Sequence, residues 1–199
     1  MPFKILLGAI IGGALMFGGG FIEHMLLDWV GRTFKAPANE STLRDNLKTH
    51  FAEPGIYSTP SRPKDFATLP MDKMKAEMEK LGEEYKKGAA YIIVPPTGQD
   101  LMTTETLGKE FGSKVIAAFL ASLVVAMTRP SIGFIGRLLV VVFIGVFSWQ
   151  FVNASYFIWY RFPWEFVQDE LMCAALSSAM GGLAIAAIVV PRPSTAPGF

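Results

Sequence analysis

The sequence predicts an α-helical membrane protein with four transmembrane helices and a small α+β insertion between helices 1 and 2. Four long apolar stretches occur in the chain, one at its start and three in its second half. Charged residues make up 18% of the 199 residues, below the roughly 25% of soluble domains, and nearly all of them lie between the first two stretches. We therefore expect a first transmembrane helix over residues 1–30, an extracytoplasmic insertion over 31–112, and a three-helix membrane segment over 113–199.

The first apolar stretch, residues 5–22, carries no charge and follows Lys4. No small-residue cleavage pattern follows it, so we expect a retained helix rather than a signal peptide. The second stretch, residues 115–128, is shorter than the ~20 residues that usually cross a bilayer. An amphipathic helix upstream is expected to run into it, and the flanking Lys114 and Arg129 can extend their charges outward. A tilted span is expected here, and a re-entrant segment is the alternative.

The third stretch covers residues 138–158, and the fourth covers 171–190 and stops at Pro191. Basic residues in short flanks predict the orientation, because cytoplasmic loops carry an excess of Lys and Arg. If all four stretches span, one side carries Lys4, Arg129, Arg137 and Arg192, whereas the loop between the third and fourth carries Arg161 with Glu165, Asp169 and Glu170. This predicts a multi-pass protein of the bacterial inner membrane with both termini cytoplasmic and the insertion in the periplasm.

Two sets of residues are expected to hold the helices in the membrane. Aromatic residues gather toward the outer end of the third stretch, where they are expected to anchor at the headgroup level: Trp149, Tyr156, Trp159, Tyr160 and Trp164. Small residues recur at a spacing of four, a pattern that lets helix backbones approach closely: Gly8, Gly12 and Gly13 in the first stretch, and Ala174, Ser178, Gly182 and Ala186 in the fourth. Such faces can pack against one another inside the bundle, or one can dock a partner subunit.

The insertion reads as two helices and two short extended segments. Asn39 or Ser41 can cap a helix that runs to about Ala52, and a second helix is expected from near Pro70 to about Lys87. Residues 56–59 and 91–94 are expected to be extended, because Pro and Gly clusters bound them. Two strands alone are marginal in water, so this cap is expected to rely on its helices or on a partner.

No arrangement of residues marks a catalytic site, so we expect a protein that is not an enzyme. Glu23 and His24, with Asp28 four residues further on the same helical face, could bind a metal or relay a proton, but we expect them to be a polar helix end at the membrane edge. The thioethers of Met71, Met74 and Met78 suit copper(I), although their spacing is also that of an apolar helix face. We assign no catalytic, cofactor or metal site to the chain. A net charge of +1 also argues against binding of nucleic acid.

Two short segments resemble parts of a family of small uncharacterised bacterial inner-membrane proteins. These segments are Pro-Gly-Ile-Tyr-Ser-Thr-Pro at residues 54–60 and Trp-Tyr-Arg-Phe-Pro at residues 159–163. The resemblance implies the same layout, with a glycine-rich first span, a periplasmic insertion and three further spans. Such proteins more often carry a glycine within the second motif, where this chain has Arg161. The resemblance implies no activity.

The leading functional interpretation is a non-catalytic accessory or scaffolding subunit of a larger membrane complex, such as a respiratory or photosynthetic one. Its partners would be other integral membrane subunits and the lipid bilayer. We expect the protein to bind no cofactor of its own and to contact lipid. Any pigment or haem of the complex would be held by neighbouring subunits. The alternative is a small transporter or a periplasm-facing metal-handling protein built around Glu23, His24 and the methionines.

Overall fold

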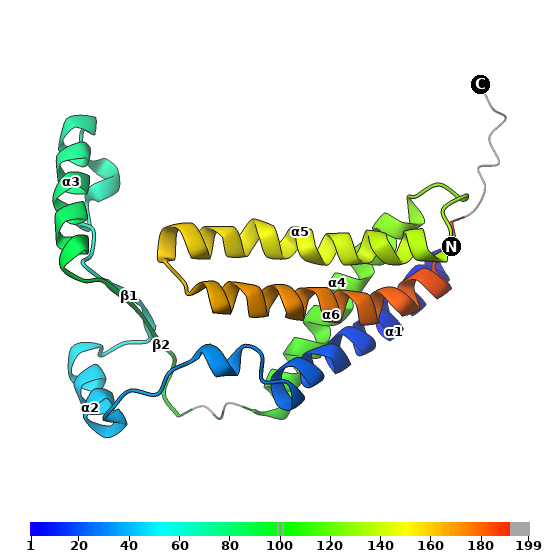
Figure 1. Ribbon diagram of the computed structural model, residues 1–199, viewed down its shortest axis with the longest axis horizontal. Coiled ribbons are helices and arrows are strands. Elements are labelled where there is room, and N and C mark those ends of the chain that lie inside the picture. The colour runs from blue at the N-terminus through cyan, green and yellow to red at the C-terminus, as the bar shows by residue number, and fades with distance from the viewer. Residues whose placement is uncertain (99, 101, 192–199) are drawn as a thin grey trace. The chain divides into compact units, whose positions relative to one another are not determined.

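The computed structural model describes residues 1–98, 100 and 102–191. The chain is mostly helical and divides into two compact units (Figure 1). Unit 1 comprises Met1–Lys35 together with Leu101–Phe199, and unit 2 comprises Ala36–Asp100. Unit 2 therefore lies within the insertion predicted for residues 31–112 and is shorter at both ends.

Unit 1 is a bundle of four long helices. Three of these helical segments are long and apolar enough to cross a membrane: Pro2–Thr33, Phe134–Tyr160 and Trp164–Ile188. The chain is therefore a membrane protein by the length and composition of its helices. The elements of the bundle are α1 (Pro2–Phe21), the π-helical turn η1 (Ile22–Leu26), the 3-10 turn η2 (Gly31–Thr33), α4 (Thr104–Ala126), α5 (Phe134–Tyr160) and α6 (Trp164–Ile188).

Helix α4 differs from the other three because charges fill its first half. The predicted amphipathic segment and the apolar run form one continuous helix of 23 residues, with its apolar part after Lys114. In its first half, Lys109 pairs with Glu105 and Lys114 pairs with Glu110. The helix is long enough to span, but its charged first half keeps it out of the set of helices apolar enough to cross a membrane, so the fourth crossing remains a prediction.

Close helix contacts in the bundle occur at glycines of α1 and α6. A Cβ added at Gly12 would lie 2.8 Å from the Ile185 side chain, and one added at Gly181 would lie 2.9 Å from the Gly12 carbonyl oxygen. A Cβ at Gly13 would lie 2.7 Å from the Cα of Val115 in α4. Glycine is required at such positions because any side chain would push the backbones apart.

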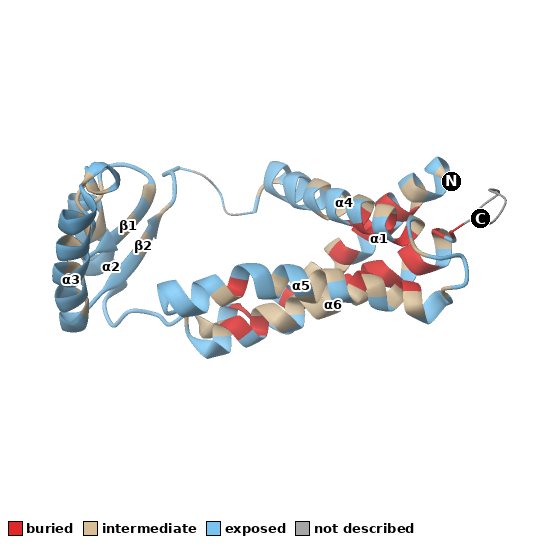
Figure 2. Cartoon of the chain, turned by 90° about the horizontal axis from the view of Figure 1, so that it is seen from above, coloured by how far each residue is buried: buried red, intermediate tan, exposed pale blue. Residues whose placement is uncertain are grey.

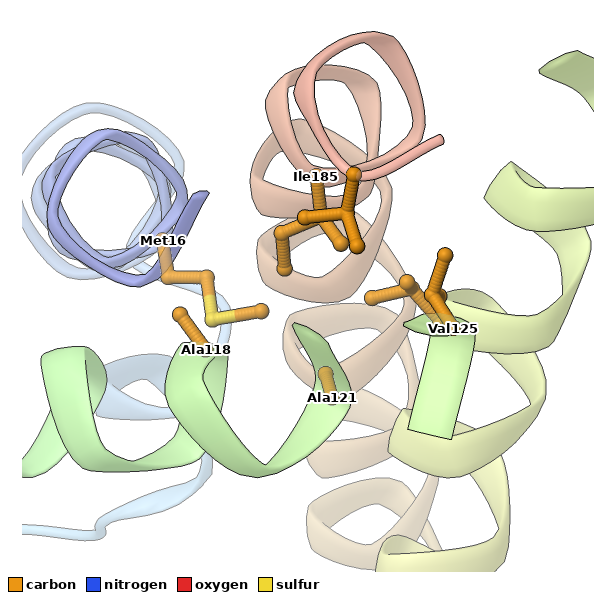
Figure 3. Packing of buried hydrophobic residues seen from close by; sticks show 7 residues of the cluster. Met16, Ala118, Ala121, Val125 and Ile185 are labelled. Atoms are coloured by element: carbon orange, nitrogen blue, oxygen red, sulfur yellow. The ribbon is translucent and has the colours of Figure 1, made fainter. Parts of the chain in front are cut away.

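The core of the bundle lies where α1, α4 and α6 meet. Met16, Ala118, Ala121, Val125 and Ile185 point toward one another there (Figure 3). Buried residues concentrate in this region and along the α5–α6 pair (Figure 2). The surrounding surface of the bundle is apolar, as expected for helices that face lipid.

Two arginines have structural roles at helix ends. Arg137 is buried and donates hydrogen bonds from Nε to the Ala186 carbonyl at 2.8 Å and from Nη1 to the Ile132 carbonyl at 2.7 Å. It thereby satisfies a carbonyl in the last turn of α6, which has no partner within that helix. Arg161 ends α5 with φ 57°, in the left-handed region that favours glycine.

Unit 2 contains the elements predicted for it. The side chain of Asn39 accepts a hydrogen bond from the Thr42 backbone N–H at the start of the first helix. The two strands pair antiparallel, with Ile56 opposite Ile93. The elements are α2 (Glu40–His50), β1 (Gly55–Thr59), the 3-10 turn η3 (Phe66–Thr68), α3 (Met71–Lys87) and β2 (Ala90–Val94).

Unit 2 lacks a buried core. Among its described residues, none is buried (Figure 2). Ile56 and Ile93 form a cross-strand pair on one face of the sheet and are 78% and 71% exposed. The apolar stripe predicted along the second helix is half-buried at Met74, while Met71 is 79% exposed.

Candidate functional site: a polar pocket in the helix bundle

The π-helical turn at the end of α1 places a carboxylate inside the bundle. Glu23 lies in η1, the turn Ile22–Leu26, and is only 4% exposed. Its carboxylate accepts a hydrogen bond from Ser177 Oγ at 2.7 Å. Ser177 lies near the middle of α6, whose 25 residues span about 37 Å at ~1.5 Å per residue. Single π-helical turns within helices often occur at functional sites, and here the turn sets the position of Glu23.

Glu23 borders a pocket of about 380 Å³. The pocket lies between η1, α4, α5 and α6, and near-central residues of α5 and α6 contribute to its wall. Its residues are Glu23, His24, Lys114, Gly145, Ser148, Trp149, Val152, Asn153, Glu170, Cys173, Ala174 and Ser177. Ionisable groups within a bundle of apolar helices are costly and rare, so this polar pocket is the candidate functional site of the chain.

Several polar groups of the pocket have capacity for a ligand. Asn153 is 6% exposed, and its side chain forms no hydrogen bond with any described residue. The carboxylate of Glu170 is half-buried and likewise has no hydrogen bond or ion pair within the described parts of the chain. Both side chains line the pocket, where water or a solute can hydrogen-bond with them.

The cation in the wall already has a partner. Lys114 forms an ion pair with Glu110 at 3.0 Å on the same helix. Lys114 alone therefore does not balance the negative charge that Glu23 and Glu170 contribute to the pocket. His24, which is exposed, completes the ionisable residues of the wall.

An ion pair ties the segment after η1 to the first part of α6. Both carboxylate oxygens of Asp169 accept from Arg32, with Arg32 Nε at 3.0 Å from Asp169 Oδ2. Asp169 is 2% exposed, whereas the Arg32 side chain is 56% exposed. Phe34 packs edge to face on Phe166 in the next turn of α6. These contacts hold the chain that follows Glu23 against the helix that carries Glu170 and Cys173.

The structure changes the interpretation of the Glu23, His24 and Asp28 group. These residues do not share one helical face, because the π-helical turn ends at Leu26 and Asp28 adopts φ 48°. Glu23 is also not an exposed polar helix end, since it packs against the middle of α6.

The metal-handling alternative receives no support from the geometry. Glu23 and His24 belong to unit 1, whereas Met71, Met74 and Met78 belong to unit 2. Among the described residues, no group of three or more His, Cys, Asp or Glu could hold a metal ion.

The other predicted sites take several roles. Gly8, Gly12, Gly13, Gly182 and Ser178 all lie against neighbouring helices of the same chain. Trp149, predicted as an anchor, donates a hydrogen bond from Nε1 to the Val167 carbonyl at 2.9 Å and lines the pocket. The remaining predicted anchors are exposed: Tyr156, Trp159, Tyr160 and Trp164. Of the small residues predicted to pack in the fourth apolar stretch, Ala186 is buried and Ala174 borders the pocket.

Sequence reasoning missed the pocket because its wall comes from segments far apart in the chain. Asn153, Glu170 and Cys173 each stand alone in an apolar or mixed stretch. One signal could have indicated the pocket: Glu170, Cys173 and Ser177 recur at every third or fourth position, which places them on one face of a helix.

Comparison with protein-family models, with curated proteins and with solved structures finds no match to this chain. The class of the protein therefore follows from its fold and its pocket: it is a helical membrane protein with a polar cavity.

Proposed function

We propose that the protein is a non-catalytic accessory subunit of a larger membrane complex, which it joins through unit 2. The observation that carries this proposal is the absence of a buried residue among the described residues of unit 2. Ordering the backbone costs on the order of 1–2 kcal/mol per residue, and apolar burial is the main compensation. A folded segment without a core needs a surface to pack on, and a partner subunit supplies one.

The sheet offers a surface suited to such packing. Ile56 and Ile93 form adjacent exposed apolar side chains, and Tyr91 follows on the same face. Exposed apolar patches of this kind mark interaction sites in folded proteins. The predicted packing glycines Gly8, Gly12, Gly13 and Gly182 lie against other helices of the same chain. In this proposal, therefore, the protein docks through unit 2 and not through these small-residue faces.

Purification from native membranes in a mild detergent tests the proposal. The wild-type chain should migrate with a large assembly on native gels, and mass spectrometry of that band should identify integral membrane partners. Ile56→Ser combined with Ile93→Ser should release the chain from the assembly. Lys80→Ala, an exposed change on α3, should leave the assembly intact. A wild-type chain that migrates alone would refute the accessory role.

The proposed topology places unit 2 in the periplasm of a bacterium, with α4 as a fourth crossing. It rests on the excess of basic residues at one end of the bundle. Protease added to intact spheroplasts should then cleave within residues 36–100. Cleavage only after lysis, in a preparation stripped of partner subunits, would contradict this orientation.

A further inference from the structure

The polar pocket of unit 1 suits a particular class of ligand. We propose that this pocket binds an organic ammonium group, carried either by a lipid headgroup or by a small free amine. This inference is independent of docking through unit 2, because every residue that lines the pocket belongs to unit 1.

The charge of the wall favours a cation. Glu23 and Glu170 both line the pocket, and the nearby Lys114 is paired with Glu110. A cation would pair with these carboxylates in an environment with little water, where charge pairing is strong. An anion would meet two carboxylates and a single lysine, which already pairs with Glu110.

The size and composition of the wall favour an organic cation over a metal ion. A cavity of about 380 Å³ is in the size range of sites for small organic molecules. Among the described residues no cluster of three or more His, Cys, Asp or Glu is available for a metal. Trp149 contributes an indole held in place by its hydrogen bond to the Val167 carbonyl, and indoles attract ammonium groups.

Asn153 completes the recognition. Asn153 is 6% exposed, lines the pocket, and its side chain has no hydrogen-bond partner among the described residues. The amide oxygen can accept an N–H of a primary or secondary amine. A quaternary ammonium would instead rely on Trp149 and on the two carboxylates.

Cys173 provides a direct test, because it is the single cysteine of the chain and lines the pocket. A methanethiosulfonate reagent bearing trimethylammonium is compared with one bearing sulfonate, using the full-length protein in detergent. Each rate is normalised to the rate with free glutathione, which removes the intrinsic reactivity of the reagents. The normalised preference for the cationic reagent should be about tenfold, because a cleft in which carboxylates outnumber lysines concentrates cations. No preference, or preference for the sulfonate, would overturn the proposal.

Protection and substitution locate the effect. Tetramethylammonium should slow labelling of Cys173, whereas sodium acetate should not. Glu23→Gln and Glu170→Gln should each reduce the cationic preference, and Glu165→Gln, an exposed change in the first turn of α6, should leave it unchanged. Glu170 has no hydrogen bond to lose among described residues, so Glu170→Gln keeps the test informative if Glu23→Gln does not fold. A folded Glu170→Gln variant with the wild-type preference would refute the assignment.

Two lipid backgrounds distinguish the sources of the ammonium. In phosphatidylglycerol vesicles, which contain no ammonium group, protection by added tetramethylammonium shows that the pocket accepts an ammonium group; equally fast labelling in phosphatidylcholine vesicles without added amine then indicates a free amine ligand. In phosphatidylcholine vesicles, protection without any added amine indicates a lipid headgroup. Either result supports the proposal, and absence of protection in both backgrounds contradicts it.

Discussion

A comparison of two glycines in α1 tests whether helix packing sets the stability of the bundle. Gly13→Ala places a Cβ 2.7 Å from the Cα and 2.9 Å from the backbone N of Val115 in α4. These are backbone atoms, so no rotamer change relieves the contact. Gly18→Ala is a matched control in the same helix, because a Cβ there meets nothing within 4 Å.

The expected magnitude follows from the difference between the two variants. Each substitution gains up to ~1 kcal/mol of intrinsic helix propensity, and this gain cancels in the comparison. Only Gly13→Ala adds the cost of overpacking, about 1–3 kcal/mol. Gly13→Ala should therefore have a free energy of unfolding lower than that of Gly18→Ala by about 1–3 kcal/mol.

Unfolding in mixed micelles with increasing dodecyl sulfate measures both variants by the loss of helical circular dichroism. The α1–α4 contact is also monitored by the edge-to-face pair of Phe17 and Phe111, through chemical shifts of the ring protons. Equal unfolding free energies for the two variants, with unchanged Phe17 shifts, would refute the claim that α1 and α4 touch through Gly13.

Three further outcomes are expected from single substitutions. Arg161→Gly should raise the free energy of unfolding by about 0.5–1 kcal/mol, since glycine adopts the left-handed φ of 57° without a side-chain penalty; Arg161→Ala, measured in the same unfolding assay, should give no such gain. Arg32→Ala should lower the unfolding midpoint because it leaves the buried carboxylate of Asp169 unpaired. If the lost ion pair is the cause, the same substitution should change the unfolding midpoint little in an Asp169→Asn background. In unit 2, the hydrogen bond with Tyr85 raises the pKa of Tyr91; Tyr85→Phe should shift the ultraviolet titration of Tyr91 to lower pH, and an unshifted curve would place α3 away from β2.

Local sequence signals predicted much of the fold. The helix from Asn39 to His50 follows from its capping residue, and the stop of α3 at Lys87 follows from Gly88. The glycine spacing of α1 indicated close approach to other helices, and the structure places Gly12 against α6 and Gly13 against α4. Such features depend on neighbours in the chain, so a single sequence contains them.

The sequence by itself determined where the apolar helices lie and that the region between the first two would be polar, because hydropathy and breaker residues act over short distances. Only the tertiary structure decided the position of Glu23. A π-helical turn, which helical periodicity in the sequence does not predict, directs its carboxylate toward Ser177, more than 150 residues away in the chain. The same holds for the pocket, whose wall combines Glu23, Lys114, Asn153 and Glu170. Their positions in the sequence do not indicate that they meet, and the pocket arises from packing that brings four helical segments together.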